Sequence, residues 1–378
     1  MRNSKLEAEI ISTLNGCFTF EEILEAPTNV WLQYAKRIKI KKKYYSYRKR
    51  ERYPRDEPTY NKCQENEFQK FLEYLEPAVN YVLDRYLPEN SSYEYYTKLH
   101  DNLICLCVKV YFGKSLRRSM GLIHYIVTKE WPDIVIPCFK TLNNYQNKSV
   151  ITFYIDKIIE ATSEPLNRLE TRFATDGTGE ATFRYSTWYS IKVGKRCRRR
   201  DHKIAQVTST VRLNAAVAVD VLNHEDPNLM QKHVKLTGNS FSIEHWSGDS
   251  YYLTRDNCNA IKENGGKAHI RIKSNTITNA RGSMEWKRTV TLQKQKDTVE
   301  LDELNLRQNA EATNSAKKRK FGSYTLSMND RSQINDIKIS WLCYNYSVLS
   351  RANYEYDIVP AFVTHKFSRI FFRLGSYT

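Results

Sequence analysis

The sequence predicts an α/β protein in which a helical N-terminal domain precedes a mixed five-stranded sheet flanked by helices. Three observations predict this class. Apolar residues recur at helical spacing from about residue 64 to residue 165. From about residue 168 the period becomes that of strands, and strand-like segments then alternate with helical ones. With 41% apolar and 12% aromatic residues, the 378-residue chain can bury the core that this architecture needs.

The chain divides into four expected segments. These are a basic N-terminal arm at residues 1–60, a helical domain at 61–165, an α/β domain at 166–352 and a C-terminal tail at 353–378. The arm is distinguished by its charge, because positions 36 to 55 hold eleven Lys or Arg residues and one acid, Glu51. Such a run is either a solvated tail or a segment that lies on a phosphate backbone, and its interleaved tyrosines favour the second interpretation.

In the helical domain the apolar period predicts two long helical stretches, FQKFLEYLEPAVNYVLDRYL and NLICLCVKVYFGKSLRRSMGLIHYIV. A break follows at Trp131-Pro132, and a short helix is expected after Phe139. The segments are compatible with a DNA-binding helical unit, although amphipathic helices that only pack on one another are the commoner outcome. No firm helix-turn-helix signature is present.

The α/β domain is expected to begin with three strands, in ETRFATDG, HKIAQVTSTV and NAAVAVDVL. A helix in DPNLMQKHVKLTG, a strand in FSIEHWSGDSYYL, a helix in TRDNCNAIKENGG and a strand in AHIRIKS follow. Residues 274 to 300 are polar with an alternating character. A long helix is expected from about Asp302 to Phe321, stopped by Gly322, and a last apolar helix in INDIKISWLCYNYSVLSR closes the core.

The charge of the chain indicates its class of partner. Lys and Arg outnumber Asp and Glu by 59 to 42, giving a net charge of +17, and such an excess on a folded protein points to a polyanion, with nucleic acid as the leading candidate. No apolar run approaches the roughly 18 to 20 residues needed to span a bilayer, and the first ten residues lack the apolar core of a signal peptide. We therefore expect a soluble intracellular protein without a membrane partner. The eight cysteines include no Cys-x-x-Cys pair and are expected to be reduced thiols.

Three acids are expected at positions where a strand ends or where a helix face points inward. Asp176 ends the first strand in FATDGTG, and Asp249 ends the fourth strand in WSGDSYYL. Glu311 is expected at mid-helix, on one face with Arg307 four residues before it and Lys318 seven after it. Taken singly, such acids are more often loop caps or members of helical salt bridges than metal ligands. Together they fit transfer at a phosphodiester, in which two Mg²⁺ ions held by carboxylates activate one oxygen and stabilise another.

The acids belong to three longer motifs. The first is Asp176-Gly177-Thr178-Gly179, followed by Trp188 and the basic run from Lys195 to Arg200. The second is Gly248-Asp249-Ser250-Tyr251-Tyr252, followed by Arg255-Asp256-Asn257. The third spaces Arg307, Glu311 and Lys318 along one helix.

These motifs resemble those of the large insertion-sequence transposase family with a DDE catalytic domain, and the resemblance runs from about Phe139 to Arg351. The first resembles the family's Asp-Ser-Thr-Gly followed by Trp, and the second its Gly-Asp-x-x-Tyr followed by a helix. The third resembles its Tyr-x2-Arg-x3-Glu-x6-Lys signature. Two positions depart from the pattern, because Leu304 stands where the family has Tyr and Gly177 where Ser is usual.

The resemblance implies a ribonuclease H-like fold for residues 166–352, in which Asp176, Asp249 and Glu311 are catalytic and hold two Mg²⁺ or Mn²⁺ ions. It also implies a homodimer that acts on double-stranded DNA, both the terminal inverted repeats of its element and the target, in the cytoplasm of a prokaryotic cell on the nucleoid. Six residues are expected to contact this DNA: Arg307, Lys318, Lys317, Arg198, Arg199 and Trp188. Lys317 and Lys318 also fit a solvated helix end, and Trp188 fits a core aromatic as well as a base-stacking one.

The function that follows is metal-dependent cleavage and transfer of DNA strands at the ends of an insertion sequence. Three alternatives stay open on the sequence alone. The first is a decayed or domesticated relative that binds DNA without cutting it, for which Leu304 and Gly177 argue mildly. The second is a nuclease of the same fold that cuts without joining, and the third is a scaffolding protein held on nucleic acid by its charge.

Overall fold

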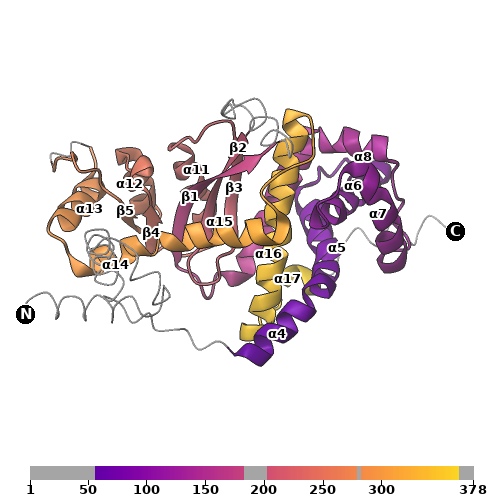
Figure 1. Ribbon diagram of the computed structural model, residues 1–378, viewed down its shortest axis with the longest axis horizontal. Coiled ribbons are helices and arrows are strands. Elements are labelled where there is room, and N and C mark those ends of the chain that lie inside the picture. Colours follow the sequence, from indigo (N-terminus) through magenta and orange to yellow (C-terminus); the bar gives the residue numbers. More distant parts are fainter. Residues whose placement is uncertain (1–55, 183–201, 279–281, 366–378) are drawn as a thin grey trace, which may run out of the picture. The chain divides into compact units, whose positions relative to one another are not determined.

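The computed structural model describes residues 56–182, 202–278 and 282–365, and the chain from Glu57 onward forms one compact unit (Figure 1). This unit is α/β, with helices followed by a five-stranded mixed sheet and further helices, as predicted. A single hydrophobic core runs through both parts.

Six α-helices fill the first part of this unit, where apolar residues recur at helical spacing. They are α4 (Glu57–Glu65), α5 (Glu67–Tyr86), α6 (Tyr93–Tyr111), α7 (Leu116–Glu130), α8 (Phe139–Gln146) and α9 (Ser149–Ser163). α6 begins where the Ser92 hydroxyl accepts a hydrogen bond from the Tyr95 N–H, which satisfies a free donor of the first turn. Every residue of α6 from Leu99 to Val110 is buried, so this helix forms the centre of the helical part.

The sheet contains the five predicted strands. They are β1 (Arg172–Ala181), β2 (His202–Thr210), β3 (Ala216–Leu222), β4 (His245–Gly248) and β5 (Lys267–Ile270). Their order across the sheet is β3-β2-β1-β4-β5. β1, β2 and β3 are antiparallel neighbours, whereas β4 pairs parallel with β1 and β5 pairs parallel with β4. The parallel pairs require crossover connections, which α11 (Leu229–Gly238) and α12 (Arg255–Glu263) supply.

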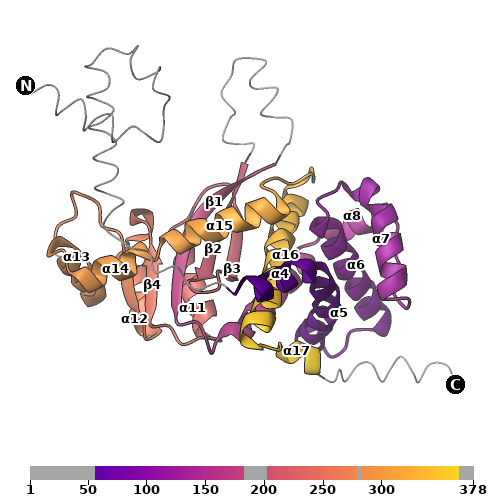
Figure 2. The ribbon, with the colours of Figure 1, turned by 60° about the horizontal axis from the view of Figure 1, so that its bottom comes forward.

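Two helices tie the sheet to the rest of the unit. α16 (Asp330–Tyr356) contacts β3 as well as α5, α6 and α9, and α15 (Gln308–Phe321) crosses the sheet over β1 and β2 (Figures 1 and 2). Beyond α16, the short helix α17 (Ala361–Thr364) buries Phe362 against α5. α16 is the apolar closing helix that the sequence predicts, and it extends further at both ends.

The structure differs from the prediction between residues 274 and 321. The polar stretch contains a helix, α13 (Met284–Lys294), and the single helix expected from Asp302 to Phe321 is two helices, α14 (Thr298–Asn305) and α15. The chain turns between them, so Glu311 lies in the first turn of α15 rather than at mid-helix. The apolar period did not predict α13 because three of its five buried residues, Glu285, Thr289 and Gln293, are polar.

Two further findings concern the described residues only. The six cysteines among them are free thiols, of which five are buried and Cys138 is exposed. No helix within these ranges has both the length and the apolar run needed to cross a bilayer.

Candidate active site

Asp176 and Asp249 lie side by side on two neighbouring strands. β1 and β4 run parallel, and their last matched pair is Thr175 with Gly248. Asp176 and Asp249 are the next residues on each chain, and Asp249 still has an extended backbone, with φ −76° and ψ 165°, before the 3₁₀ turn Ser250–Tyr252 begins. Neighbouring strands are about 4.8 Å apart. The register therefore brings the two acids to one edge of the sheet, as predicted from their positions in the first and fourth strands.

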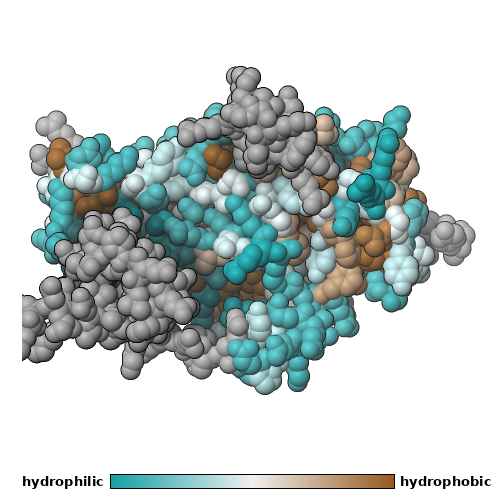
Figure 3. Space-filling view, in the orientation of Figure 1, coloured by the Kyte–Doolittle hydropathy of each residue, from teal (hydrophilic) through white to brown (hydrophobic). Residues whose placement is uncertain are grey.

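α15 brings the third acid to Asp176. Side chains alternate along β1, so that Asp176, Thr178 and Glu180 face α15. Asn314 Nδ2 donates a 3.0 Å hydrogen bond to Asp176 Oδ2, which fixes the helix over the strand. Asp176 and Glu311 line one open pocket of about 430 Å³, in a region where hydrophilic side chains cover α15 (Figure 3). Asp249 does not line this pocket.

Negative charge is crowded at this edge of the sheet. Burial, together with the carboxylates of Glu311 and Glu225, raises the pKa of Asp176 to about 6, against the lowering effects of the Gly177 N–H and of Arg307. Burial and the Asp249 carboxylate likewise raise the pKa of Glu225. Four carboxylates thus influence one another where β4 ends beside the middle of β1. The prediction that Asp176 ends the first strand is wrong, because β1 stays paired with β2 as far as Ala181.

Glu225, the fourth of these acids, was not predicted from the sequence. It follows β3, and its carboxylate occupies the space beside the backbone of Gly177, where an added Cβ would lie 1.4 Å from Oε1. The Tyr251 hydroxyl donates a 2.9 Å hydrogen bond to the Glu225 carbonyl and so ties this loop to the turn after Asp249. No sequence signal could have located Glu225, because it lies on a loop after β3 and belongs to no motif.

Two of the predicted basic residues lie beside the acids. Arg307 Nη1 forms a 2.7 Å ion pair with Glu311 Oε1, and the Glu311 side chain remains 53% exposed. Lys318 lines the pocket with Glu311, and Ser315 lies between them on the same face of α15. The exposed Arg319 lines it too, although the sequence argument did not single it out.

Lys317 requires a correction, because it does not lie on the pocket wall as a surface cation. Residues Ala310, Thr313, Asn314 and Lys317 recur at helical spacing and form the face of α15 that is buried against the sheet. The Lys317 ammonium donates a 2.7 Å hydrogen bond to Glu180 Oε1 and lies 5.5 Å from the centre of the Trp341 ring. Its side chain is 2% exposed, so it cannot contact DNA phosphates in this conformation.

The remaining predicted contacts fall elsewhere. Trp188, Arg198 and Arg199 lie between residues 183 and 201, outside the described residues, as does the basic run at positions 36 to 55. Trp246 is a core aromatic, whose indole N–H donates to Thr175 Oγ1 at 3.1 Å.

The donor set at the strand edge fits a hard divalent cation. Within the described ranges, no three His, Cys, Asp or Glu side chains come close enough together to form a ready metal cage. The side chains on offer are nevertheless carboxylates, which Mg²⁺ and Mn²⁺ prefer as ligands. Burial and the neighbouring carboxylates of Glu311 and Glu225 raise the pKa of Asp176, and a cation would relieve the repulsion among these carboxylates.

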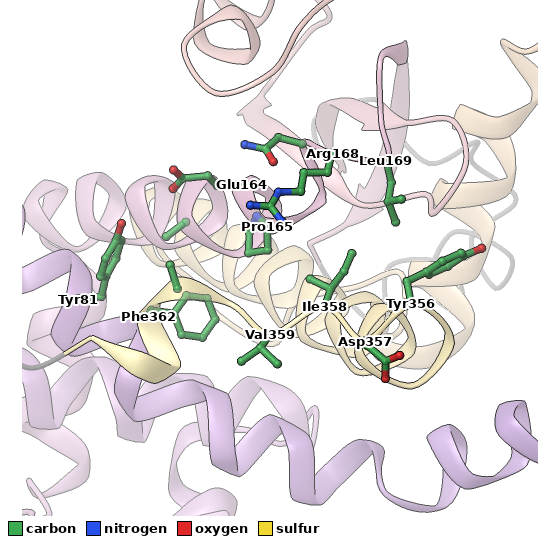
Figure 4. Close-up of a pocket in the computed structure, with 13 residues that line it drawn as sticks. Tyr81, Glu164, Pro165, Arg168, Leu169, Tyr356, Asp357, Ile358, Val359 and Phe362 are labelled. Carbon is green, nitrogen blue, oxygen red and sulfur yellow. The ribbon is translucent and has the colours of Figure 1, made fainter.

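Another pocket lies away from these residues (Figure 4). It encloses about 560 Å³ between the turn that follows α9 and the connection from α16 to α17, with Pro165 and Arg168 on one side and Val359 and Phe362 on the other. None of the residues in the three sequence motifs lines it.

Comparison with known proteins assigns no family, because no family model matches the chain and no curated protein does. The motifs and the geometry of the chain itself are therefore the basis for inferring its function.

Proposed function

We propose that this chain is a DNA transposase of the DDE type, with a ribonuclease H-like catalytic domain that cuts and joins DNA strands at the ends of an insertion sequence. The observation that carries the proposal is the parallel register of β1 and β4, which sets Asp176 beside Asp249. α15 adds Glu311 to the pocket that Asp176 lines. Acids from the first strand, the fourth strand and a later helix are what the resemblance implies.

The sheet supports the same proposal. An antiparallel unit of β1, β2 and β3 extended by parallel β4 and β5, in the order β3-β2-β1-β4-β5, agrees with a ribonuclease H-like sheet. The helix with the third acid packs on β1 through the Asn314 contact to Asp176. The β1–β4 register thereby supports pairing Asp176 with Asp249, and α15 adds Glu311 to the pocket that Asp176 lines.

Each residue of the site has a role in this reaction. Asp176, Asp249 and Glu311 would hold two Mg²⁺ ions, which when bound would activate the attacking oxygen and stabilise the leaving one. Asn314 orients the Asp176 carboxylate, and Arg307 restrains the exposed carboxylate of Glu311. Lys318 and Arg319 on the pocket wall would bind the phosphates of the DNA strand. As in the family that the motifs resemble, a homodimer would act on paired ends.

One of the two departures from the family motifs has a local explanation. Glycine stands at position 177 where the family has serine, and the Glu225 carboxylate occupies the space that a side chain there would fill. The site therefore keeps a compact acidic edge at this position, which favours an active enzyme over a decayed copy. Leu304 lines a neighbouring polar pocket with Arg271 and Arg307, and nothing in the structure explains the loss of tyrosine there.

The DNA that flanks the gene supplies the substrate for the decisive experiment. Inverted repeats found there are placed on a labelled duplex and incubated with the full-length protein, Mg²⁺ and a target plasmid. We expect strand cleavage at the repeat ends and covalent joints between those ends and the plasmid. Cleavage without joints would identify a nuclease of the same fold, and binding without cleavage a decayed relative.

A further inference from the structure

α7 presents one buried face and one exposed face. Its buried residues, Ser119, Ile123, Ile126 and Val127, follow the helical period and pack towards α6 and α8. The helix lies on the outer side of α6, away from the sheet, in Figures 1 and 2. Its opposite face is exposed and consists of Arg117, Arg118, Gly121, Leu122, His124, Tyr125, Thr128 and Lys129.

The exposed face of α7 is positively charged. No acid occurs in the helix before its last residue, Glu130, whereas Arg117 and Arg118 occupy the first turn and the exposed Lys114 precedes them. In the part of the chain that the structure describes, neither arginine has an acidic partner. The Arg117 guanidinium instead lies 4.8 Å from the centre of the Phe139 ring, which holds the planar group at the edge of the surface.

The exposed face of α7 contains a glycine that no contact within the described chain requires. Gly121 lies in the middle of α7, and a Cβ added to it would meet no atom within 4 Å. Glycine destabilises a helix interior relative to alanine, so neither packing nor backbone conformation of this chain calls for it. It leaves a low point on the helix surface between the arginines and Tyr125, whose side chain is 72% exposed. A surface of this shape admits close approach by another molecule.

The connection between α6 and α7 is a short turn. It spans the four residues 112–115 and contains Gly113 with φ +60°. Short turns of this length with a glycine join the helices of αα-hairpins as well as those of helix-turn-helix units. In the helix-turn-helix arrangement the second helix enters the major groove of DNA with its N-terminal residues at the base edges. The 15 residues of α7 give it a length of about 22 Å.

We propose that α7 is the helix through which this protein reads double-stranded DNA. Its exposed face lies in the major groove, with Arg117 and Arg118 on guanine edges or adjacent phosphates, Gly121 at the closest approach and Leu122 against thymine methyl groups. The inference rests on the proposed function only for the identity of the DNA, which would be the end of the element.

The test is equilibrium binding by the full-length protein, measured in EDTA so that no cleavage occurs. The probes are a duplex enriched from a random 20-bp library by the wild-type protein and an unselected duplex of the same length. We expect Arg117→Ala/Arg118→Ala to bind the enriched duplex about 10- to 100-fold more weakly and to lose most of the preference over the unselected one. The matched control, Lys235→Ala/Lys262→Ala, removes the same charge from exposed positions on α11 and α12 and should bind nearly as the wild type does.

A second variant separates folding from binding. Gly121→Gln should raise the melting temperature, because glutamine is the better helix former and has open space at this position, yet weaken DNA binding by filling the low point. Binding by the α7 variants that equals the control would overturn the inference, even if the enzyme cleaves DNA normally. Binding that depends on α7 without any metal-dependent cleavage would support the inference and refute the proposed function instead.

Discussion

The Glu225 carboxylate occupies the space that a side chain at Gly177 would need, because a Cβ on residue 177 would lie 1.4 Å from Oε1 of Glu225. The absence of that atom lets the carboxylate lie against the backbone one residue after Asp176. From there Glu225 adds to the burial and to the Glu311 charge that raise the pKa of Asp176. The glycine thus allows a further carboxylate to lie beside Asp176 in the middle of β1.

Replacing Gly177 by serine should therefore weaken cation binding more than it weakens folding. The clash is with the end of a flexible side chain, so Glu225 can swing away, and the melting temperature should change by only a few degrees. The departing carboxylate takes a negative charge with it, and we expect Mg²⁺ to bind several-fold more weakly in calorimetric titrations. Gly179→Ser is the matched control, since a Cβ there meets nothing within 4 Å. Equal Mg²⁺ affinities for the two variants would contradict this role of Gly177.

The pKa of Asp176 predicts a pH dependence of stability. Because the folded-state pKa is raised from 3.8 to about 6, the folded protein binds a proton more tightly than the unfolded chain does. Without divalent cations, stability should therefore fall as pH rises from about 4 to about 6 and stay lower above that range. Asp176→Asn should flatten this decline and gain at most roughly 3 kcal/mol at pH 7. Urea unfolding in EDTA at several pH values measures this pH dependence of stability. Parallel stability curves for the wild type and Asp176→Asn would show that Asp176 does not cause it.

Divalent cations should reverse this destabilisation in the wild-type protein. A cation that binds only the folded state stabilises it by about 2.7 kcal/mol at a concentration 100 times its dissociation constant. We expect Mg²⁺ or Mn²⁺ to raise the melting temperature of the wild type and to leave that of Asp176→Asn nearly unchanged. Glu263→Gln, which removes an exposed acid on α12, should respond as the wild type does. A response that survives in Asp176→Asn would place the cation elsewhere.

Lys317 and Lys318 are adjacent in sequence but should behave oppositely. Lys317→Ala leaves the Glu180 carboxylate buried without its partner, which should cost about 3 to 5 kcal/mol of folding stability. Lys318→Ala removes a cation from the pocket wall and should weaken DNA binding with little effect on stability. Thermal unfolding and DNA binding of both variants decide this. A stable Lys317→Ala protein with weakened DNA binding would restore Lys317 to the DNA-contacting surface.

The sequence predicted the sheet well because strand and helix periods alternate clearly after residue 168. The run NAAVAVDVL, for example, gives β3 (Ala216–Leu222), and the segment around Trp246 gives β4. α13 could not be predicted in the same way, because Glu285, Thr289 and Gln293 lie on its buried face and hide its apolar period.

The candidate site was predictable only as far as its motifs reach. The expected positions of Asp176 and Asp249 at the ends of the first and fourth strands were enough to predict them side by side, and the β1–β4 register brings them there. The predicted end of the first strand was wrong, because β1 continues from Asp176 to Ala181. Lys317 could not be told from Lys318 by composition, since only the direction of α15 over β1 decides which of the two is buried. Glu225 lies on a loop after β3 and belongs to no motif, so its approach to Gly177 appears only in three dimensions.

The central claim is that Asp176, Asp249 and Glu311 act together in metal-dependent cleavage of DNA. Its most direct test is the initial rate of strand cleavage at a labelled element end in Mg²⁺, compared among Asp176→Asn, Asp249→Asn, Glu311→Gln and the control Glu263→Gln. We predict that each of the first three loses about 100-fold or more in rate while still binding the end, and that the control cleaves at the wild-type rate. Metal-dependent cleavage that persists after loss of any one of the three acids would contradict the claim.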